Sequence, residues 1–177
     1  MTVYWIASAG LRLGTMARPR GGEWLNDELR GLAAQGVITL VSCLEPHEEL
    51  ELNLLREAEM WRTHGRFVAF PVGDRQTPQS STEAMALAAA LTQAAQSGAL
   101  VAHCRMGVGR ATMVAALVLL EVGKTVDEAL ELIAEARGRP VPDTPRQVEW
   151  LRSYAARRDL ERLIADATPI EPGIRSA

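Results

Sequence analysis

The chain has 177 residues, of which 47% are hydrophobic and 23% are charged, values typical of one folded domain rather than a disordered or fibrous chain. The 19 basic and 22 acidic residues give a formal charge of −3, which argues against a nucleic-acid-binding protein because such domains are usually basic. The two cysteines, Cys43 and Cys104, are too few for a disulfide scaffold or a cysteine-based metal site.

The first residues lack the basic segment and long apolar run of a secretion signal. The longest apolar run, residues 113–120, is too short to cross a bilayer. We therefore expect a cytoplasmic protein without a membrane partner, in which both thiols are reduced. We expect a single domain over residues 1–167 and a loose C-terminal tail at 168–177, and the sequence leaves the oligomeric state open.

The first half of the sequence alternates between short apolar runs and segments with helical spacing. Residues 37–44 have apolar side chains at both odd and even positions, as in a strand covered on both faces. In chain order the predicted elements are strands at 3–7 and 11–14 around a turn at 8–10, a helix from 24 to 36, the strand at 37–44, helical residues at 46–63 in one or two pieces, and a strand at 66–70.

The second half continues the alternation and carries clearer helix signals. Ser80 with Glu83, and Thr125 with Glu128, have the spacing of a capping box at a helix start. Pro145 fits the first position of the last helix. The predicted elements are a helix from 80 to 98, a strand at 99–102, a loop at 103–110, a helix to 121, a helix from 125 and a last helix from 144. This order predicts an α/β fold with a mostly parallel central sheet flanked by helices.

The loop at residues 103–110 has the sequence His-Cys-Arg-Met-Gly-Val-Gly-Arg. Gly107 and Gly109 allow the backbone to curl so that successive N–H groups point at one anion, and the following helix directs its N-terminus to the same place. Arg110 can return across the mouth of the loop and grip two phosphate oxygens. Because this positive field favours a thiolate at Cys104, the loop predicts a nucleophile beside a bound phosphate. A small, inert core cysteine is the alternative.

These residues resemble the phosphate loop of the protein tyrosine and dual-specificity phosphatase superfamily. The resemblance rests on the Cys-x5-Arg string with its leading His103 and Gly-x-Gly-Arg ending. It extends to the stretches G-V-I-T-L-V-S, F-P-V-G-D-R-Q-T-P and V-P-D-T-P-R-Q of this chain, which look like segments of compact bacterial and dual-specificity members.

The resemblance implies a dual-specificity-phosphatase-like fold, with the phosphate loop between a strand and a helix, and hydrolysis of phosphomonoesters through a phosphocysteine at Cys104. It also implies that His103 hydrogen-bonds the loop and orients the cysteine, and that the enzyme uses no metal and no cofactor. The loop residues implied to bind the substrate are Arg105, Met106, Gly107, Val108 and Gly109.

The reaction also needs a proton donor for the leaving oxygen. Asp74 lies in a loop after a strand, and the resemblance gives an aspartate in this P-x-x-D position the role of general acid. Taken alone, Asp74 beside Gly73 would be an ordinary turn residue. Asp143 is the alternative acid, although its position just before a helix start explains it as a turn residue. Gln147 could place the hydrolytic water, as a glutamine does in some family members, but a helix cap explains it more simply.

The chain departs from the family pattern directly after the arginine. Family members usually carry Ser or Thr there, and its hydroxyl hydrogen-bonds the thiolate. Ala111 stands at this position, and Thr112 is rotated by about 100° along the helix, so we do not expect Thr112 to substitute. The departure puts the turnover rate in doubt and keeps a phosphate-binding pseudophosphatase as an alternative to an enzyme.

Cys43, at the end of the predicted strand at 37–44, has two interpretations. It is either a small core residue or, as in relatives with a second cysteine at a comparable strand end, a redox partner that traps oxidised Cys104 as a disulfide. The substrate is predicted only by class. Proteins bearing phosphotyrosine are the first choice, with phosphoserine and phosphothreonine as further targets. A small phosphomonoester such as an inositol phosphate or phosphosugar is the alternative, with Arg75 and Arg105 flanking the pocket.

Overall fold

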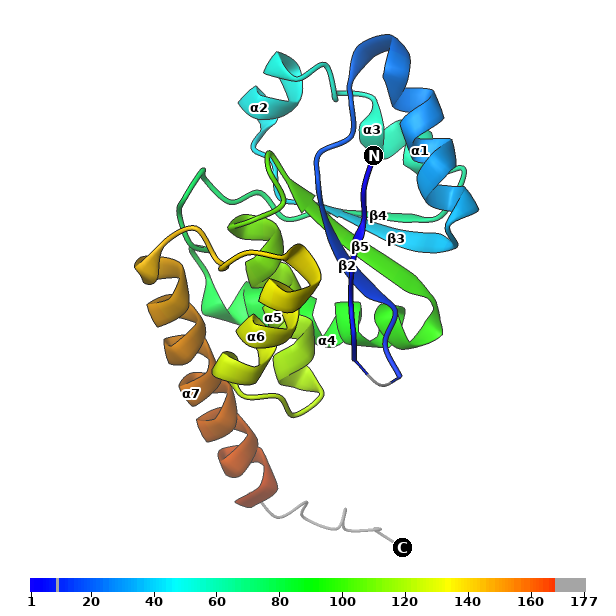
Figure 1. The fold of residues 1–177 in the computed structure, drawn as a ribbon. Helices are drawn as coiled ribbons and strands as arrows, with labels where there is room; N and C mark the ends of the chain where they lie inside the picture. The colour runs from blue at the N-terminus through cyan, green and yellow to red at the C-terminus, as the bar shows by residue number, and fades with distance from the viewer. Residues whose placement is uncertain (9, 168–177) are drawn as a thin grey trace, which may run out of the picture.

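A five-stranded sheet with helices on both faces forms the centre of the computed structural model, which describes residues 1–8 and 10–167 (Figure 1). The spatial order of the strands is β1-β2-β5-β3-β4. Only β1 runs antiparallel to its neighbour among these strands, so the mostly parallel α/β sheet expected from the sequence is confirmed. The strands are β1 (Tyr4–Ile6), β2 (Leu13–Ala17), β3 (Val37–Ser42), β4 (Arg66–Ala69) and β5 (Ala99–Cys104).

The helices begin where the capping signals of the sequence indicate. Thr125 and Glu128 form both halves of the expected capping box, and the Ser80 side chain accepts a hydrogen bond from the Glu83 N–H. The described α-helices are α1 (Leu25–Ala34), α2 (Pro46–Glu51), α3 (Glu57–Trp61), α4 (Ser81–Ser97), α5 (Arg110–Glu121), α6 (Val126–Arg137) and α7 (Pro145–Ala167). None of the helices in this described part of the chain is both long and apolar enough to cross a membrane.

The second strand lies further along the chain than the sequence pattern indicates. β2 extends to Ala17 because its pairing with β5 runs in register from Leu13 opposite Leu100 to Ala17 opposite Cys104. Gly and Ala in this segment have little strand propensity of their own, so the pairing partner decides the boundary. Ala9 of the expected turn and the expected tail at 168–177 lie outside the described residues.

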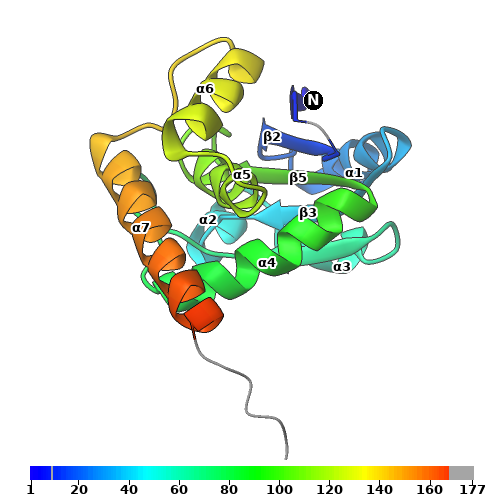
Figure 2. The same ribbon diagram turned by 90° about the horizontal axis from the view of Figure 1, so that it is seen from below.

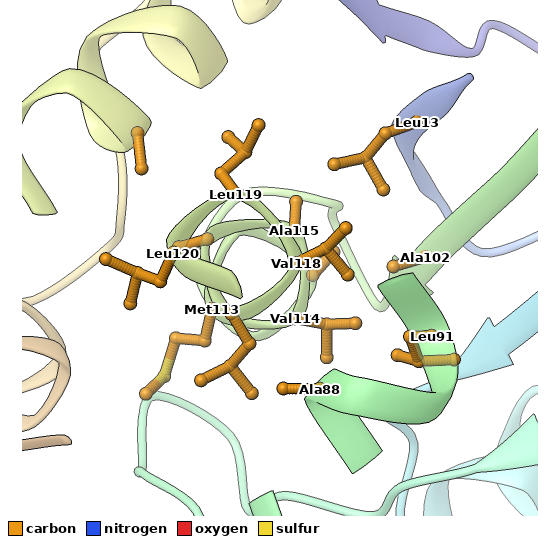
Figure 3. Close-up of a cluster of buried hydrophobic side chains, with 14 of the residues drawn as sticks. Leu13, Ala88, Leu91, Ala102, Met113, Val114, Ala115, Val118, Leu119 and Leu120 are labelled. Atoms are coloured by element: carbon orange, nitrogen blue, oxygen red, sulfur yellow. The ribbon is translucent and has the colours of Figure 1, made fainter. Parts of the chain in front are cut away.

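The central strand β5 is buried on both faces and separates two hydrophobic clusters. Ala102 and Cys104 belong to the cluster that contains residues of α4, α5 and α6, whereas Val101 belongs to the cluster that contains residues of α1 and α3. The former cluster surrounds α5 (Figure 3). Figure 2 shows α4, α5 and α6 next to the sheet, with α7 outside α5. Since residues 110–120 of α5 are all buried, the helix that follows the loop is held firmly inside the domain.

Candidate active site

The Cys-x5-Arg loop lies at the carboxyl end of the central strand. Cys104 is the last residue of β5 and Arg110 is the first residue of α5, so the five residues 105–109 join strand to helix. On the neighbouring strand β2, Ala17 is paired with Cys104. Open α/β sheets bind their ligands at this edge, and the expected placement of the loop between a strand and a helix is confirmed.

The loop curls back onto the cysteine sulfur. Gly107 has a φ of +69°, and its N–H donates a hydrogen bond to Cys104 Sγ at 3.2 Å. A Cβ at Gly107 would clash with the carbonyl oxygen of Met16, so only glycine fits there. The glycine therefore permits both the left-handed turn and the close approach of the loop to β2. Cys104 itself is only 3% exposed, near the positive N-terminal end of α5.

The guanidinium of Arg110 is buried and held by two carboxylates. Nη1 donates to Glu48 Oε2 at 2.6 Å and to the Val72 carbonyl at 2.9 Å. Nη2 donates to Glu48 Oε1 at 3.0 Å and to Asp74 Oδ1 at 3.1 Å. Burial alone would lower the pKa of Arg110, but the hydrogen bonds and charge of Glu48, with the charge of Cys104, raise it. The paired contacts with Glu48 thus fix the arginine beside the loop as a permanent cation.

Glu48 of α2 is a site residue that sequence reasoning did not identify. It is 2% exposed and also accepts hydrogen bonds from Arg105 Nε at 3.3 Å and from the Glu45 N–H at 3.0 Å. Burial opposes ionisation of Glu48, but the hydrogen bonds from Arg110, Glu45 and Arg105 lower its pKa to about 2. Its one local signal is the capping box with Glu45, which says nothing of an arginine 62 residues away.

Asp74, the expected general acid, lies in the segment between β4 and α4. Its contact with Arg110 Nη2 brings it to the phosphate loop, and its side chain is 64% exposed. A carboxyl group in this position is open to an incoming substrate while it is tied to the arginine that would hold the phosphate. The structure therefore gathers Cys104, Arg110 and Asp74 at one end of the sheet.

A model of the Swiss Army Knife family PTP-SAK, described as a DSP-PTPase phosphatase domain, matches residues 3–160. The chain belongs to this family. Three solved structures have a similar fold. Kinase associated phosphatase has a TM-score of 0.79 and 17% identity, covering 89% of this chain and 95% of that chain. Tk-PTP has a TM-score of 0.71 and 21% identity, covering 88% of this chain and 97% of that chain, and human DUSP28 has a TM-score of 0.62 and 20% identity, covering 90% of this chain and 99% of that chain. None of the curated proteins matches the chain.

The variable loop positions of this PTP-SAK domain differ in their surroundings. Arg105 donates to Glu51 of α2 at 2.6 and 3.2 Å and also contacts Glu48. Its charge is therefore already paired, which weakens the expected role of Arg105 in flanking a polyanionic substrate. Met106 is 65% exposed, whereas Val108 is buried. Among these side chains, Met106 is the one most open to a substrate.

Asp143 and Gln147 also lie against the loop of the PTP-SAK domain. A Cβ at Gly109 would clash with Asp143 Oδ2 and approach Gln147 Nε2 to 3.1 Å, so both side chains are close to Gly109. Gln147 exchanges hydrogen bonds with Thr144, its N–H reaching Thr144 Oγ1 at 3.3 Å and its Oε1 accepting the Thr144 N–H at 3.2 Å. The helix-cap interpretation of Gln147 is confirmed, and Asp143 remains near enough to stay a candidate acid.

The side chain of His103 faces away from that of Cys104, because successive side chains of a strand point to opposite faces. Its Nε2 lies 3.1 Å from Glu57 Oε1 of α3, and both side chains are buried. The approach is close but not aligned as a hydrogen bond, and neither imidazole nitrogen has a hydrogen-bond partner among the described residues. Among the described residues the His103 imidazole makes no hydrogen bond to the loop, so the expected role of His103 in orienting the cysteine stays a prediction.

The residues after Arg110 lack a hydroxyl bonded to the cysteine. Ala111 and Thr112 are both fully buried, and Thr112 Oγ1 has no hydrogen-bond partner in the part of the chain that the structure describes. Thr112 therefore does not replace the missing hydroxyl, as expected from its rotation along α5.

Cys43 directly follows β3, and its N–H donates to the His103 carbonyl at 2.9 Å. The two cysteines therefore stand at the ends of adjacent strands, which lie about 4.8 Å apart in a sheet. Both are free and buried. Burial, and next the charge of Cys104, raise the pKa of the Cys43 thiol well above its ordinary value. Cys43 is thus a protonated thiol next to Cys104.

Proposed function

We propose that this PTP-SAK domain hydrolyses phosphomonoesters through a phosphocysteine, and that its substrates are proteins bearing phosphotyrosine, with phosphoserine and phosphothreonine as further targets. The convergence of Cys104, Arg110 and Asp74 on one loop carries the proposal. The sulfur accepts the N–H of Gly107, the arginine is fixed by Glu48, and the carboxyl group is exposed beside them.

The proposed reaction has two steps. In the first, the Cys104 thiolate attacks phosphorus and forms the S–P bond while the bond to the leaving oxygen breaks, and Asp74 gives its proton to that oxygen. In the second, water attacks the phosphocysteine, Asp74 takes a proton from the water, and the thiolate leaves with its electron pair. Arg110 and the loop N–H groups stabilise the charge on the other phosphate oxygens in both steps.

The exposed side chain of Met106 supports an aryl phosphate as substrate. A methionine at the mouth of the loop can pack against the ring of a phosphotyrosine. The alternative of a small polyanionic phosphomonoester held by Arg105 has less support, because that arginine is paired with Glu48 and Glu51. A phosphate-binding pseudophosphatase is supported by Ala111 alone, since the missing hydroxyl would slow breakdown of the phosphocysteine.

Hydrolysis of an aryl phosphate by wild type and Cys104→Ser tests the proposal. We expect turnover by wild type and none by Cys104→Ser, which should still bind vanadate or phosphate because the loop N–H groups and Arg110 remain. Cys43→Ser is the matched control on the adjacent strand and should retain turnover. Absence of turnover by wild type with intact vanadate binding would identify the pseudophosphatase, and equal turnover by Cys104→Ser would exclude the phosphocysteine mechanism.

A further inference from the structure

The turn that carries Asp74 contains a residue in the left-handed backbone region. Residues 73–76, which we name the acid turn, are closed by the Gln76 N–H, which donates to the Gly73 carbonyl at 2.9 Å. The third residue of the acid turn, Arg75, has a φ of +57°. Glycine and asparagine are the usual residues at a left-handed third position of a turn, so the arginine there needs a physical explanation.

The side chain of Arg75 does not account for the conformation of its own backbone. A residue with a Cβ is destabilised in the left-handed region by contact with its own peptide groups, and asparagine offsets part of this cost with a short local hydrogen bond. Asn53 is the other non-glycine residue with a positive φ in the described part of the chain. The Arg75 side chain is exposed, and no ion pair among residues 1–8 and 10–167 involves it.

Hydrogen bonds to the folded core fix the acid turn at both ends. Before the turn, buried Val72 donates its N–H to the Cys43 carbonyl at 3.2 Å, and its own carbonyl accepts from Arg110 Nη1 at 2.9 Å. At the end of the turn, the Gln76 carbonyl accepts a bond of 3.0 Å from Nε2 of Gln147, a buried residue of α7. A strained conformation persists where its surroundings determine it, and these two anchors impose it on the residues between them.

The left-handed residue determines the backbone at the expected general acid. Because both ends of the acid turn are fixed, an ordinary negative φ at Arg75 would have to be compensated by rotations at Gly73 and Asp74. Asp74 Oδ1 accepts from Arg110 Nη2 at 3.1 Å, although the Asp74 side chain is 64% exposed. An exposed turn closed by one backbone hydrogen bond opens at a small cost in free energy. A replacement at position 75 should therefore alter the fraction of molecules in which the carboxyl group is in place.

We infer that Arg75 is a positioning residue, whose left-handed backbone conformation keeps the Asp74 carboxyl group beside Arg110, where it gives its proton to the leaving oxygen. The role of Asp74 as the acid rests on the proposed function. The inference assigns the effect to the backbone at position 75. It thereby differs from the role in which the Arg75 guanidinium flanks the pocket for a polyanionic substrate.

Two replacements that both remove the guanidinium separate the backbone from the charge. Glycine adopts the left-handed region without steric cost, whereas valine is strongly disfavoured there because it is branched at Cβ. We measure kcat/KM for phosphotyrosine, whose leaving group needs a proton, and for an activated aryl phosphate, whose leaving group does not. The ratio of these values should be at least as high in Arg75→Gly as in wild type. It should be about tenfold lower in Arg75→Val than in Arg75→Gly, which corresponds to ~1.4 kcal/mol, the size of the left-handed cost.

Gly123→Val is the control for a general loss of stability. Gly123 follows α5 and has a φ of +90°, and an added Cβ would meet no atom of the described residues within 4 Å. The replacement therefore imposes the same left-handed cost at the end of α5 that is remote from the phosphate loop. It should leave the ratio of the two kcat/KM values at the wild-type level.

Equal ratios in Arg75→Gly and Arg75→Val overturn the inference, and an equal loss in both assigns the effect of Arg75 to its guanidinium. A ratio that Gly123→Val lowers as much as Arg75→Val also overturns it. These outcomes leave turnover of the activated aryl phosphate, and with it the proposed function, intact. If wild type does not hydrolyse phosphotyrosine, the proposed function fails, and hydrogen exchange of the Gln76 N–H decides the inference separately. Exchange about tenfold faster in Arg75→Val than in Arg75→Gly supports it, and equal exchange overturns it.

Discussion

Replacement of Glu48 by glutamine removes the charge that holds Arg110 and keeps the size of the side chain. The pKa of about 2 for Glu48, against an ordinary value of 4.5, corresponds to about 3 kcal/mol of stabilisation at neutral pH, at ~1.36 kcal/mol for each pKa unit. The glutamine oxygen can still accept one bond from Arg110. We therefore expect Glu48→Gln to lower the free energy of unfolding by about 2–3 kcal/mol at pH 7.

The same replacement removes a pH dependence of the unfolding free energy. A carboxyl group whose pKa is lower in the folded than in the unfolded protein stabilises the fold above its unfolded pKa, and this stabilisation is lost as the pH falls toward the folded pKa. For Glu48 the loss occurs between pH 4.5 and about 2. Glutamine does not titrate, so the difference in unfolding free energy between wild type and Glu48→Gln should shrink across this range.

Urea unfolding followed by tryptophan fluorescence at pH 7 and pH 3 measures this difference. A displaced Arg110 should also lower kcat/KM for an aryl phosphate by about 10²-fold, as expected for misplacement of a catalytic group by about 1 Å. Glu51→Gln is the matched control, because Glu51 is on the same helix but is exposed, and among the described residues its side chain bonds only to Arg105. It should change stability little. A stability difference for Glu48→Gln that is the same at both pH values would refute the reasoning.

Three further changes test other parts of the site. Asp74→Asn should reduce kcat/KM strongly for phosphotyrosine and weakly for an activated aryl phosphate whose leaving group needs no proton, and should remove the alkaline limb of the pH–rate profile; equal losses for both substrates would remove Asp74 from the acid role. Ala111→Ser should increase the steady-state rate relative to the pre-steady-state burst if the absent hydroxyl limits breakdown of the phosphocysteine, and an unchanged ratio would show that it does not. Mild peroxide should oxidise Cys104 to a sulfenic acid, which the Cys43 thiol captures as a disulfide with release of water; mass spectrometry should find this reductant-sensitive bond in wild type, whereas equal irreversible sulfinic acid in wild type and Cys43→Ser would make Cys43 a packing residue.

The fold class and the phosphate loop could be predicted from the sequence because their signals are local. Strand, loop and helix follow one another within residues 99–121, and the glycine needed at position 107 is visible in the string itself. Helix starts could also be predicted from the sequence, since a capping box spans only four residues. The end of β2 could not be predicted in this way, because pairing with β5, rather than its own Gly-Thr-Met-Ala segment, extends that strand to Ala17.

The partners of the loop, by contrast, were decided only by the tertiary structure. Glu48 and Glu57 have no local pattern that connects them with Arg110 and His103. Arg105, expected to contact the substrate, is instead paired with glutamates of α2. These are contacts between polar and charged groups far apart in the chain, whose strength depends on burial and on the angle of approach. A periodic pattern of residues records which side of one element is buried. It does not record which other element lies against that side, and that arrangement determines where the charges of this site meet.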